Sequence, residues 1–163
     1  MEYKIKKGLD IRLNGRADRA MKRVETGTYL IRPEDFRWLK PRVLTQPDDT
    51  VAVGTPLFCS KEDERLVIVS PVSGTVREIV RGERRAIEAI IIDAAPQACF
   101  VRQCDVPQPN DGNDIADLLL QNGLWPFLRQ RPFSTIPNPD SRPKALFVSC
   151  FDSAPLAPET AIL

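Results

Sequence analysis

Short apolar runs alternate with turn-forming residues through the middle of the chain. Residues that favour turns stand between these runs, including Pro47 with Asp48 and the glycines Gly74 and Gly82. β-Strands that are so short and so closely spaced predict a compact all-β barrel or sandwich. The apolar runs cover residues 42–45, 51–58, 66–69, 75–80 and 86–92.

Helical signals are concentrated in the second half of the chain. Residues 114–122 carry apolar side chains at helical spacing, which predicts an α-helix. Asn113 or Asp114 is expected to cap its N-terminus, and Gly123 is expected to end it in a left-handed conformation. A second, short helix is expected over residues 125–130.

Two proline-containing segments have their own local predictions. Pro33 followed by two acidic residues favours a single helical turn, because proline suits the first position of a helix and acids suit its first turn. Residues 131–137 are expected to be extended, because Pro132 and Pro137 each disfavour a helical conformation in the preceding residue.

The distribution of prolines divides the chain into parts. Residues 1–95 hold five of the 15 prolines and are strand-rich, whereas residues 96–143 form a Pro-rich connection that contains both predicted helices. Residues 144–152 are almost continuously apolar, which predicts a central strand of a parallel sheet. Only eleven residues follow it, too few for a crossover helix and a partner strand. Residues 144–163 are therefore expected to begin a truncated α/β domain, and the fold class is α+β, mainly β.

Composition excludes several classes of protein. The chain has 163 residues, of which 42% are hydrophobic and 28% charged, as in soluble globular domains. The net charge of +1 gives no overall field for nucleic acid. Apolar runs fall well short of the roughly 20 residues of a membrane span, and the polar N-terminus is unlike a signal peptide. A cytoplasmic location is expected, with membrane contact only through partners.

Metal and catalytic motifs are missing from the sequence. The chain has no histidine, and its four cysteines have no C-x-x-C spacing, so inert thiols are favoured over a metal or redox site. The sequence also lacks a phosphate-binding glycine loop and a nucleophile elbow. We therefore predict no metal site and no catalytic residue.

A pair of glycine motifs resembles the hammerhead of biotinyl and lipoyl carrier domains, which are barrel-sandwich hybrids. The motifs are residues 49–57, with Gly54, and residues 70–76, with Gly74. Each glycine is expected to turn the backbone with positive φ. A carrier holds its cofactor on a lysine between two such motifs, but Lys61 lacks the flanking residues and spacing. No modified lysine is predicted; a carrier modified on Lys61 and a stand-alone interaction module are the alternatives.

Arginines gather near the second motif and near the predicted short helix. Arg77, Arg81, Arg84 and Arg85 could bind phosphate or an acidic partner, but interleaved glutamates favour a solvated face. The run 129–133, with nearby Trp125 and Phe127, fits either ordinary helix packing or a surface that meets another subunit or a flat hydrophobic ligand.

Six ordered motifs together resemble the N-terminal part of the A subunit of the bacterial Na⁺-translocating NADH:quinone oxidoreductase. The series covers nearly the whole chain and is much more specific than the hammerhead alone. The motifs are Lys6–Ile11, Gly54–Leu57, Ser70–Gly74, Val80–Arg85, Gly123–Trp125 and Arg131–Ser134.

This resemblance implies a peripheral, non-catalytic subunit on the cytoplasmic face of the bacterial inner membrane. NADH, flavins and iron–sulfur clusters would be held by other subunits, and this chain would carry no cofactor. Its partners would be those subunits and the quinone. A quinone headgroup needs an apolar slot and hydrogen-bond donors, and two segments offer aromatic residues beside donors. The candidate quinone-binding residues are Phe36, Arg37, Trp38, Arg131, Phe133 and Ser134.

Overall fold

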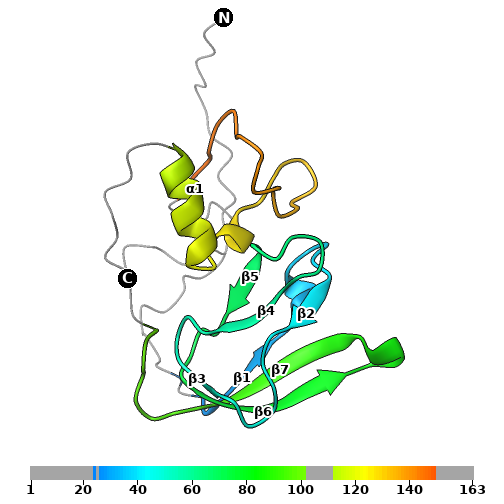
Figure 1. The fold of residues 1–163 in the computed structure, drawn as a ribbon, viewed down its shortest axis with the longest axis vertical. Coiled ribbons are helices and arrows are strands. Elements are labelled where there is room, and N and C mark those ends of the chain that lie inside the picture. Colours follow the sequence, from blue (N-terminus) through cyan, green and yellow to red (C-terminus); the bar gives the residue numbers. More distant parts are fainter. Residues whose placement is uncertain (1–23, 25, 102–111, 150–163) are drawn as a thin grey trace, which may run out of the picture. The chain divides into compact units, whose positions relative to one another are not determined.

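The computed structural model describes residues 24, 26–101 and 112–149 of the chain (Figure 1). Contacts divide the chain into a unit of residues 25–142 and a second unit made of residues 1–24 and 143–163. Every strand and helix described below lies in the first unit. Within the described residues, no helix is both long enough and apolar enough to span a membrane.

Two small antiparallel sheets form the first part of this unit. One sheet has the strand order β1-β7-β6-β3, and the other has the order β2-β4-β5. Both contain short strands, apart from the long hairpin of β6 and β7 (Figure 1). The strands are β1 (Thr28–Ile31), β2 (Pro41–Val43), β3 (Thr50–Val51), β4 (Pro56–Ser60), β5 (Val67–Val69), β6 (Gly74–Arg81) and β7 (Ile87–Ala94).

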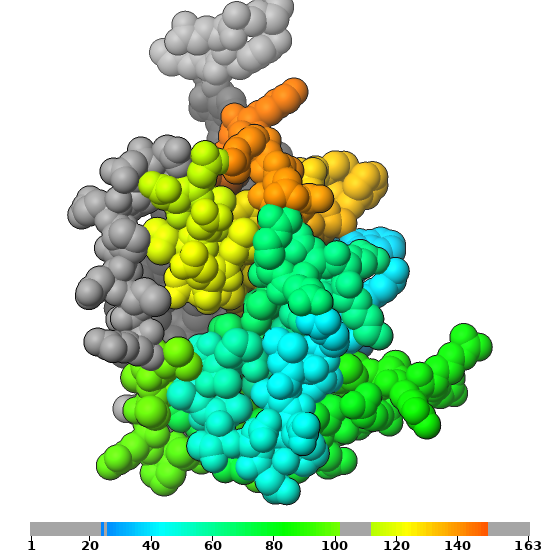
Figure 2. Space-filling view, viewed as in Figure 1, coloured from blue at the N-terminus to red at the C-terminus, as the bar shows by residue number. Residues whose placement is uncertain are grey.

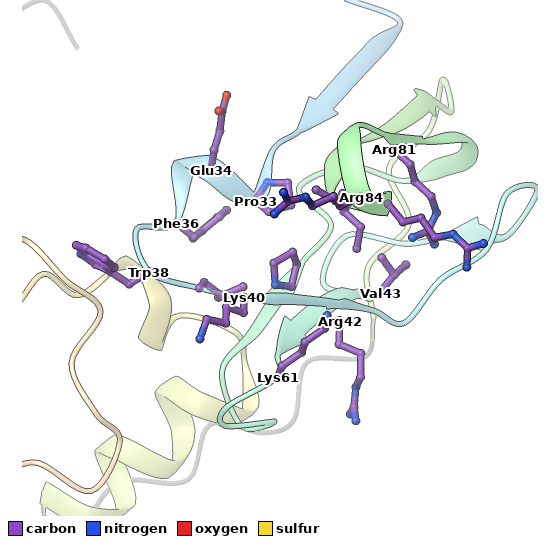
Figure 3. Close-up of a pocket in the computed structure, with 15 residues that line it drawn as sticks. Pro33, Glu34, Phe36, Trp38, Lys40, Arg42, Val43, Lys61, Arg81 and Arg84 are labelled. Atoms are coloured by element: carbon purple, nitrogen blue, oxygen red, sulfur yellow. The ribbon is translucent and has the colours of Figure 1, made fainter.

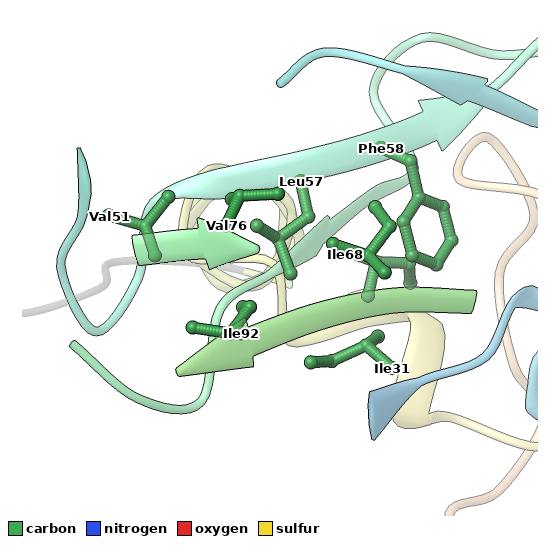
Figure 4. Packing of buried hydrophobic residues seen from close by; sticks show 8 residues of the cluster. Ile31, Val51, Leu57, Phe58, Ile68, Val76 and Ile92 are labelled. Carbon is green, nitrogen blue, oxygen red and sulfur yellow. The ribbon is translucent and has the colours of Figure 1, made fainter. Parts of the chain in front are cut away.

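The hydrophobic core draws on both sheets (Figure 4). In β7, Ile90 and Ile92 are fully buried while Ile91 between them is only half-buried, which is the two-residue period of a strand. Burying one such side chain contributes roughly 1.5–3 kcal/mol. The core consists of Ile31, Val51, Leu57, Phe58, Ile68, Val76, Ile90 and Ile92.

The two hammerhead glycines are needed for different reasons. Gly54 has φ +94°, as predicted, and its amide donates to the carbonyl of Ser70 at 2.9 Å. The same prediction is wrong for Gly74, which is absent from the positive-φ residues. A Cβ on Gly74 would instead overlap the backbone carbonyl of Asp93 on the paired strand β7. Close approach of two backbones, rather than a turn, requires this glycine.

A helix and a short 3-10 turn follow the sheets. Helix α1 (Gly112–Gln121) ends at Gly123, which has φ +65°. The amide of Leu124 donates to the Leu119 carbonyl, and that of Gly123 to the Leu120 carbonyl, which is the Schellman pattern of helix ends. The expected helix over residues 125–130 is shorter in the structure.

The 3-10 helix η3 (Trp125–Phe127) occupies the start of that expected helix. Leu128 is extended, with φ −69° and ψ 144°, and Gln130 pairs with Thr135. The helix ends early because the chain turns back on itself after Gln130. Residues 144–149, which were expected to begin a mainly apolar strand, form no strand in the structure. A strand needs a partner for its backbone groups, and residues 150–163 lie outside the described part.

Candidate functional site

The segment after β1 turns sharply and carries three of the predicted quinone-binding residues. The 3-10 helix η1 (Pro33–Asp35) begins with a buried proline, as the sequence predicts, and the amide of Phe36 closes it on the Pro33 carbonyl at 3.0 Å. Trp38 then adopts φ +69° and is 80% exposed. A large apolar side chain is thus held in solvent by a backbone conformation that non-glycine residues seldom adopt.

Phe36 links this turn to the core. Its ring contacts those of Phe58, in the core, and Phe127, in η3, with both pairs edge to face and both centroid distances 6.0 Å. Such pairs contribute about 0.5–1.5 kcal/mol beyond area burial. Phe36 is half-buried, whereas Phe127 is exposed. The row of three rings therefore runs from the interior to the surface.

The other predicted segment forms a turn rather than the expected extended chain. Residues 131–134 are turned, and the amide of Gln130 donates to the Thr135 carbonyl at 2.8 Å. Ser134 has φ +57°, and Phe133 stands 74% exposed at the turn. The segment is anchored nearby by buried Trp125, whose Nε1 donates to the carbonyl of Pro137 at 2.9 Å. Pro132 and Pro137 disfavour a helix here, but they do not prevent a turn. The hydrogen bond between Gln130 and Thr135 closes that turn.

The structure brings the two segments together. Nη1 of Arg37 donates to the Phe133 carbonyl at 3.4 Å, across 96 positions of sequence. Of the remaining predicted residues, Arg131 is exposed and Ser134 is half-buried. We call the exposed and half-exposed rings on this junction the aromatic surface. It consists of Phe36, Trp38, Phe127 and Phe133.

Phe127 was not among the predicted quinone-binding residues. Its presence beside Trp125 near a cationic run marked a general contact surface in the sequence, but nothing local connected it with Phe36. The connection is a tertiary contact, and only the fold supplies it.

A second feature is an open pocket of about 650 Å³ (Figure 3). One wall comes from η1 and β2, and the other comes from the end of the β6–β7 hairpin. Apolar side chains, including Phe36, Val43 and Ile87, line part of it. We call it the basic pocket, because six cationic side chains also line it: Lys40, Arg42, Lys61, Arg81, Arg84 and Arg85.

Two of these six cations have acidic partners. Lys40 Nζ donates to Glu62 at 2.8 Å, and hydrogen bonding to that carboxylate raises the pKa of Lys40. Arg42 Nη1 donates to Glu64 at 2.6 Å, and hydrogen bonding to the guanidinium lowers the pKa of Glu64. The remaining four cations have no ion pair with any acid in the part of the chain that the structure describes.

The hairpin that carries three of these arginines ends in an unusual turn. Arg84 has φ 54° and ψ 27°, and Arg85 has φ 61°. Positive φ at both central positions is the pattern of a type I′ turn, where Asn-Gly is preferred. Left-handed conformation costs an L-residue roughly 1–2 kcal/mol. Arg84 and Arg85 therefore adopt a left-handed backbone conformation that arginine disfavours.

Lys61 lies at the base of its hairpin rather than at the tip. It follows β4 directly, and its amide donates to the Lys40 carbonyl at 2.8 Å. Buried Ser60 beside it accepts hydrogen bonds from the amides of Glu62 and Asp63. This local geometry directs Lys61 to the wall of the basic pocket.

The cysteines are separated in the described residues. Cys59 is buried in β4, Cys99 is exposed, and both thiols are free. No group of three potential ligands that could hold a metal occurs within residues 26–101 or 112–149. Cys104 and Cys150 lie outside the described residues, as does the predicted motif Lys6–Ile11.

Comparison with known proteins addresses the family. Residues 3–95 match the family model of the NqrA N-terminal barrel-sandwich hybrid domain, and residues 110–163 match that of the NqrA second alpha/beta domain. The first match confirms the predicted barrel-sandwich fold, and the described residues, mainly strands with one α-helix, agree with the α+β class.

Individual relatives share one name, which describes each as the A subunit of a Na(+)-translocating NADH-quinone reductase. The protein from Rhodopirellula baltica is 34% identical over 169 residues, which cover 98% of this chain and 36% of that protein. The proteins from Pseudomonas aeruginosa (strain UCBPP-PA14) and Tolumonas auensis are 33% and 35% identical over 164 residues, which cover 98% of this chain and 37% of each relative.

The chain thus spans just over a third of the length of the curated relatives it matches. The family matches cover both the sheets and the helix-containing segment that follows them. The resemblance predicted from six sequence motifs is confirmed, and the chain belongs to the NqrA family, the A subunits of the Na⁺-translocating NADH-quinone reductases.

Proposed function

We propose that this chain acts within a Na⁺-translocating NADH:quinone oxidoreductase, where it contributes to quinone binding and to assembly. The family membership and the names of the relatives support the choice of complex. In this proposal the chain is peripheral, on the cytoplasmic face of the inner membrane. NADH, flavins and iron–sulfur clusters are held by other subunits, and this chain contributes no redox group of its own.

The observation that carries the quinone proposal is the junction of Arg37 with the Phe133 loop. Through one hydrogen bond it joins two segments that each carry an exposed aromatic side chain, Trp38 and Phe133. Flat rings suit the aromatic face of a quinone, and the exposed position suits a ligand or subunit that arrives from outside. Without this junction the two segments would offer only isolated apolar side chains.

Arg37 also has the chemistry that a quinone requires. A guanidinium has five N–H donors, and only one nitrogen of Arg37 is engaged by the Phe133 carbonyl. The others are available to a quinone carbonyl oxygen. A fixed positive charge beside that oxygen favours the negative charge that develops there as electrons arrive. In this role Arg37 binds and orients the quinone, and Ser134 offers a second donor.

The test uses the assembled complex with Trp38→Ala and Phe133→Ala in this subunit. We expect the KM for quinone to rise, on the order of tenfold for the double variant, because truncating a binding hot spot typically costs more than 1 kcal/mol. Phe100→Ala is the matched control, since Phe100 is also exposed but lies outside the aromatic surface.

Subunit content separates binding from assembly. A raised KM in a complex of normal composition supports quinone contact, whereas loss of other subunits supports a role in assembly. Unchanged turnover, KM and composition in the double variant would remove the aromatic surface from both roles.

A further inference from the structure

The basic pocket has more positive charge than its own acids can balance. Lys61, Arg81, Arg84 and Arg85 line it without an ion pair in the described residues. The one acid in its lining, Glu34, contacts Arg32, and Figure 3 shows its carboxylate pointing away from Lys40 and Arg42. The excess of positive charge is therefore local to the pocket, because the net charge of the whole chain is only +1.

The fold separates the hairpin arginines from the glutamates that interleave with them in the sequence. Glu78, Glu83 and Glu88 do not line the pocket. The Glu88 carboxylate lies against Gly82 instead. The sequence pattern favoured a solvated face of mixed charge, but the structure gathers one sign of charge around a concave surface. Such an arrangement concentrates anions, because a cleft focuses the field of the charges that line it.

The backbone of the hairpin end supports a role for the arginine side chains. The amide of Gly82 donates to the Ala86 carbonyl at 2.8 Å, and that of Ala86 to the Glu83 carbonyl at 3.0 Å. These bonds hold Arg84 and Arg85 in left-handed conformations, where Asn and Gly are preferred. Two arginines at this turn work against its stability, which points to a use for their guanidinium groups. Figure 2 shows the hairpin (green) standing out from the surface, open to a ligand.

We propose that the basic pocket binds a phosphate-bearing ligand. Guanidinium groups form paired hydrogen bonds with phosphate oxygens, and a lysine adds a compact point charge. Four unpaired cations match a multiply charged phosphate group better than a single carboxylate. The volume of about 650 Å³ leaves space for an attached group against Phe36, Val43 and Ile87. The pocket shares Phe36 and Trp38 with the aromatic surface, but the phosphate proposal rests on the cations and does not depend on quinone binding.

Binding of inorganic pyrophosphate to the purified chain, measured by calorimetry at low ionic strength, tests the site. The key variant is Arg84→Asn with Arg85→Gly, which installs the preferred turn residues. We expect its affinity for pyrophosphate to fall about tenfold or more while its thermal midpoint rises. Lys61→Gln, on a different hairpin, is expected to weaken binding as well. Arg77→Gln is the control: Arg77 is on β6, pairs with Asp93 and is not in the pocket lining.

A comparison of vesicle binding with pyrophosphate binding shows whether the phosphate belongs to a lipid headgroup or to a soluble compound. Co-sedimentation with phosphatidylglycerol vesicles, abolished by the double variant and by added pyrophosphate, indicates a lipid headgroup. Pyrophosphate binding without selective vesicle binding indicates a soluble phosphate compound. The proposal is overturned if the chain binds neither probe, or if the double variant and Lys61→Gln bind both probes as tightly as the unaltered chain does.

Discussion

The Cβ that Gly123 lacks would lie 2.6 Å from Cγ1 of Val69, on strand β5. Gly123 also has φ +65°, so the residue that ends helix α1 is constrained both by its backbone and by its neighbour. The Schellman bonds at the helix end and the contact with the sheet thus meet at one position. This glycine sets how closely the end of α1 approaches β5.

Gly123→Ala is expected to destabilise the chain by about 2–4 kcal/mol, because a strained left-handed backbone and an overpacked contact add together. Denaturant unfolding followed by Trp125 fluorescence measures the loss. The measurement is best made in a Trp38→Phe background, which leaves Trp125 as the only tryptophan. Gly27→Ala is the control, since nothing lies within 4 Å of a Cβ there. Equal effects at the two glycines would contradict the proposed contact.

Gly74→Ala is expected to disturb the β6–β7 pairing, because the new methyl group would overlap the Asp93 carbonyl. The two backbones must move apart, and we expect a loss on the order of 2–4 kcal/mol. Thermal unfolding followed by far-ultraviolet circular dichroism reports the change in the sheets. A melting temperature within error of that of Gly27→Ala would show that the sheet relaxes freely at this position.

Phe36 and Phe127 are expected to be energetically coupled, because their rings meet edge to face at 6.0 Å. A double-mutant cycle with Phe36→Leu and Phe127→Leu should give a coupling free energy of about 0.5–1.5 kcal/mol. Phe133→Leu replaces Phe127→Leu in the control cycle, since no ring contact joins Phe133 to Phe36 among the described residues. Similar coupling in both cycles would argue for a general effect on folding instead.

Arg65 links the β4–β5 hairpin to the segment that follows η3 through ion pairs with Asp63 and Asp140, whose strength depends on pH. Its guanidinium donates to Asp140 at 2.8 and 2.9 Å and to Asp63 at 2.7 Å. Hydrogen bonds from Arg65 lower the pKa of both aspartates below the ordinary value of an aspartate. Because the folded pKa values are depressed, the stabilisation is present above about pH 4 and is lost as the pH falls through the lowered values.

Arg65→Met should therefore flatten the stability profile in acid. We expect the unaltered chain to lose more stability than this variant between about pH 5 and pH 2, as measured by urea unfolding of the Trp125 signal. Asp140→Asn should reduce the acid dependence in the same direction. High salt should shrink the difference, since all three groups are at least partly exposed. If the free energy of unfolding depends on pH in the same way for the unaltered chain and for Arg65→Met, the Arg65 ion pairs do not stabilise the fold.

Local patterns in the sequence were sufficient for several elements. Turn residues and short apolar runs indicated the strands other than β1, and the left-handed Gly123 at the end of α1 was expected from its position after an apolar stripe. The reasons are short-range: proline restricts φ, glycine permits positive φ, and alternation selects a strand. The ordered motifs indicated the family by resemblance, and the family matches confirm it.

Other features were beyond local reasoning. Gly74 looked like a turn glycine, yet it is needed because a neighbouring strand passes close to it. Residues 131–134 looked extended, yet the hydrogen bond between Gln130 and Thr135 closes them into a turn. Residues 144–149 form no strand in the structure, although their mainly apolar pattern favours one. For Gly74 and for residues 131–134, a contact with a facing backbone decides the outcome.

By itself, the sequence indicated most of the strands, the fold class and the family, but it missed β1 and the turn at residues 131–134. The tertiary structure decided which side chains act together: it joined Arg37 to the Phe133 loop and placed Arg81, Arg84 and Arg85 around a pocket that their neighbouring glutamates do not line. The physical reason is that backbone preference depends on adjacent residues, whereas a binding surface depends on the packing that brings distant segments together.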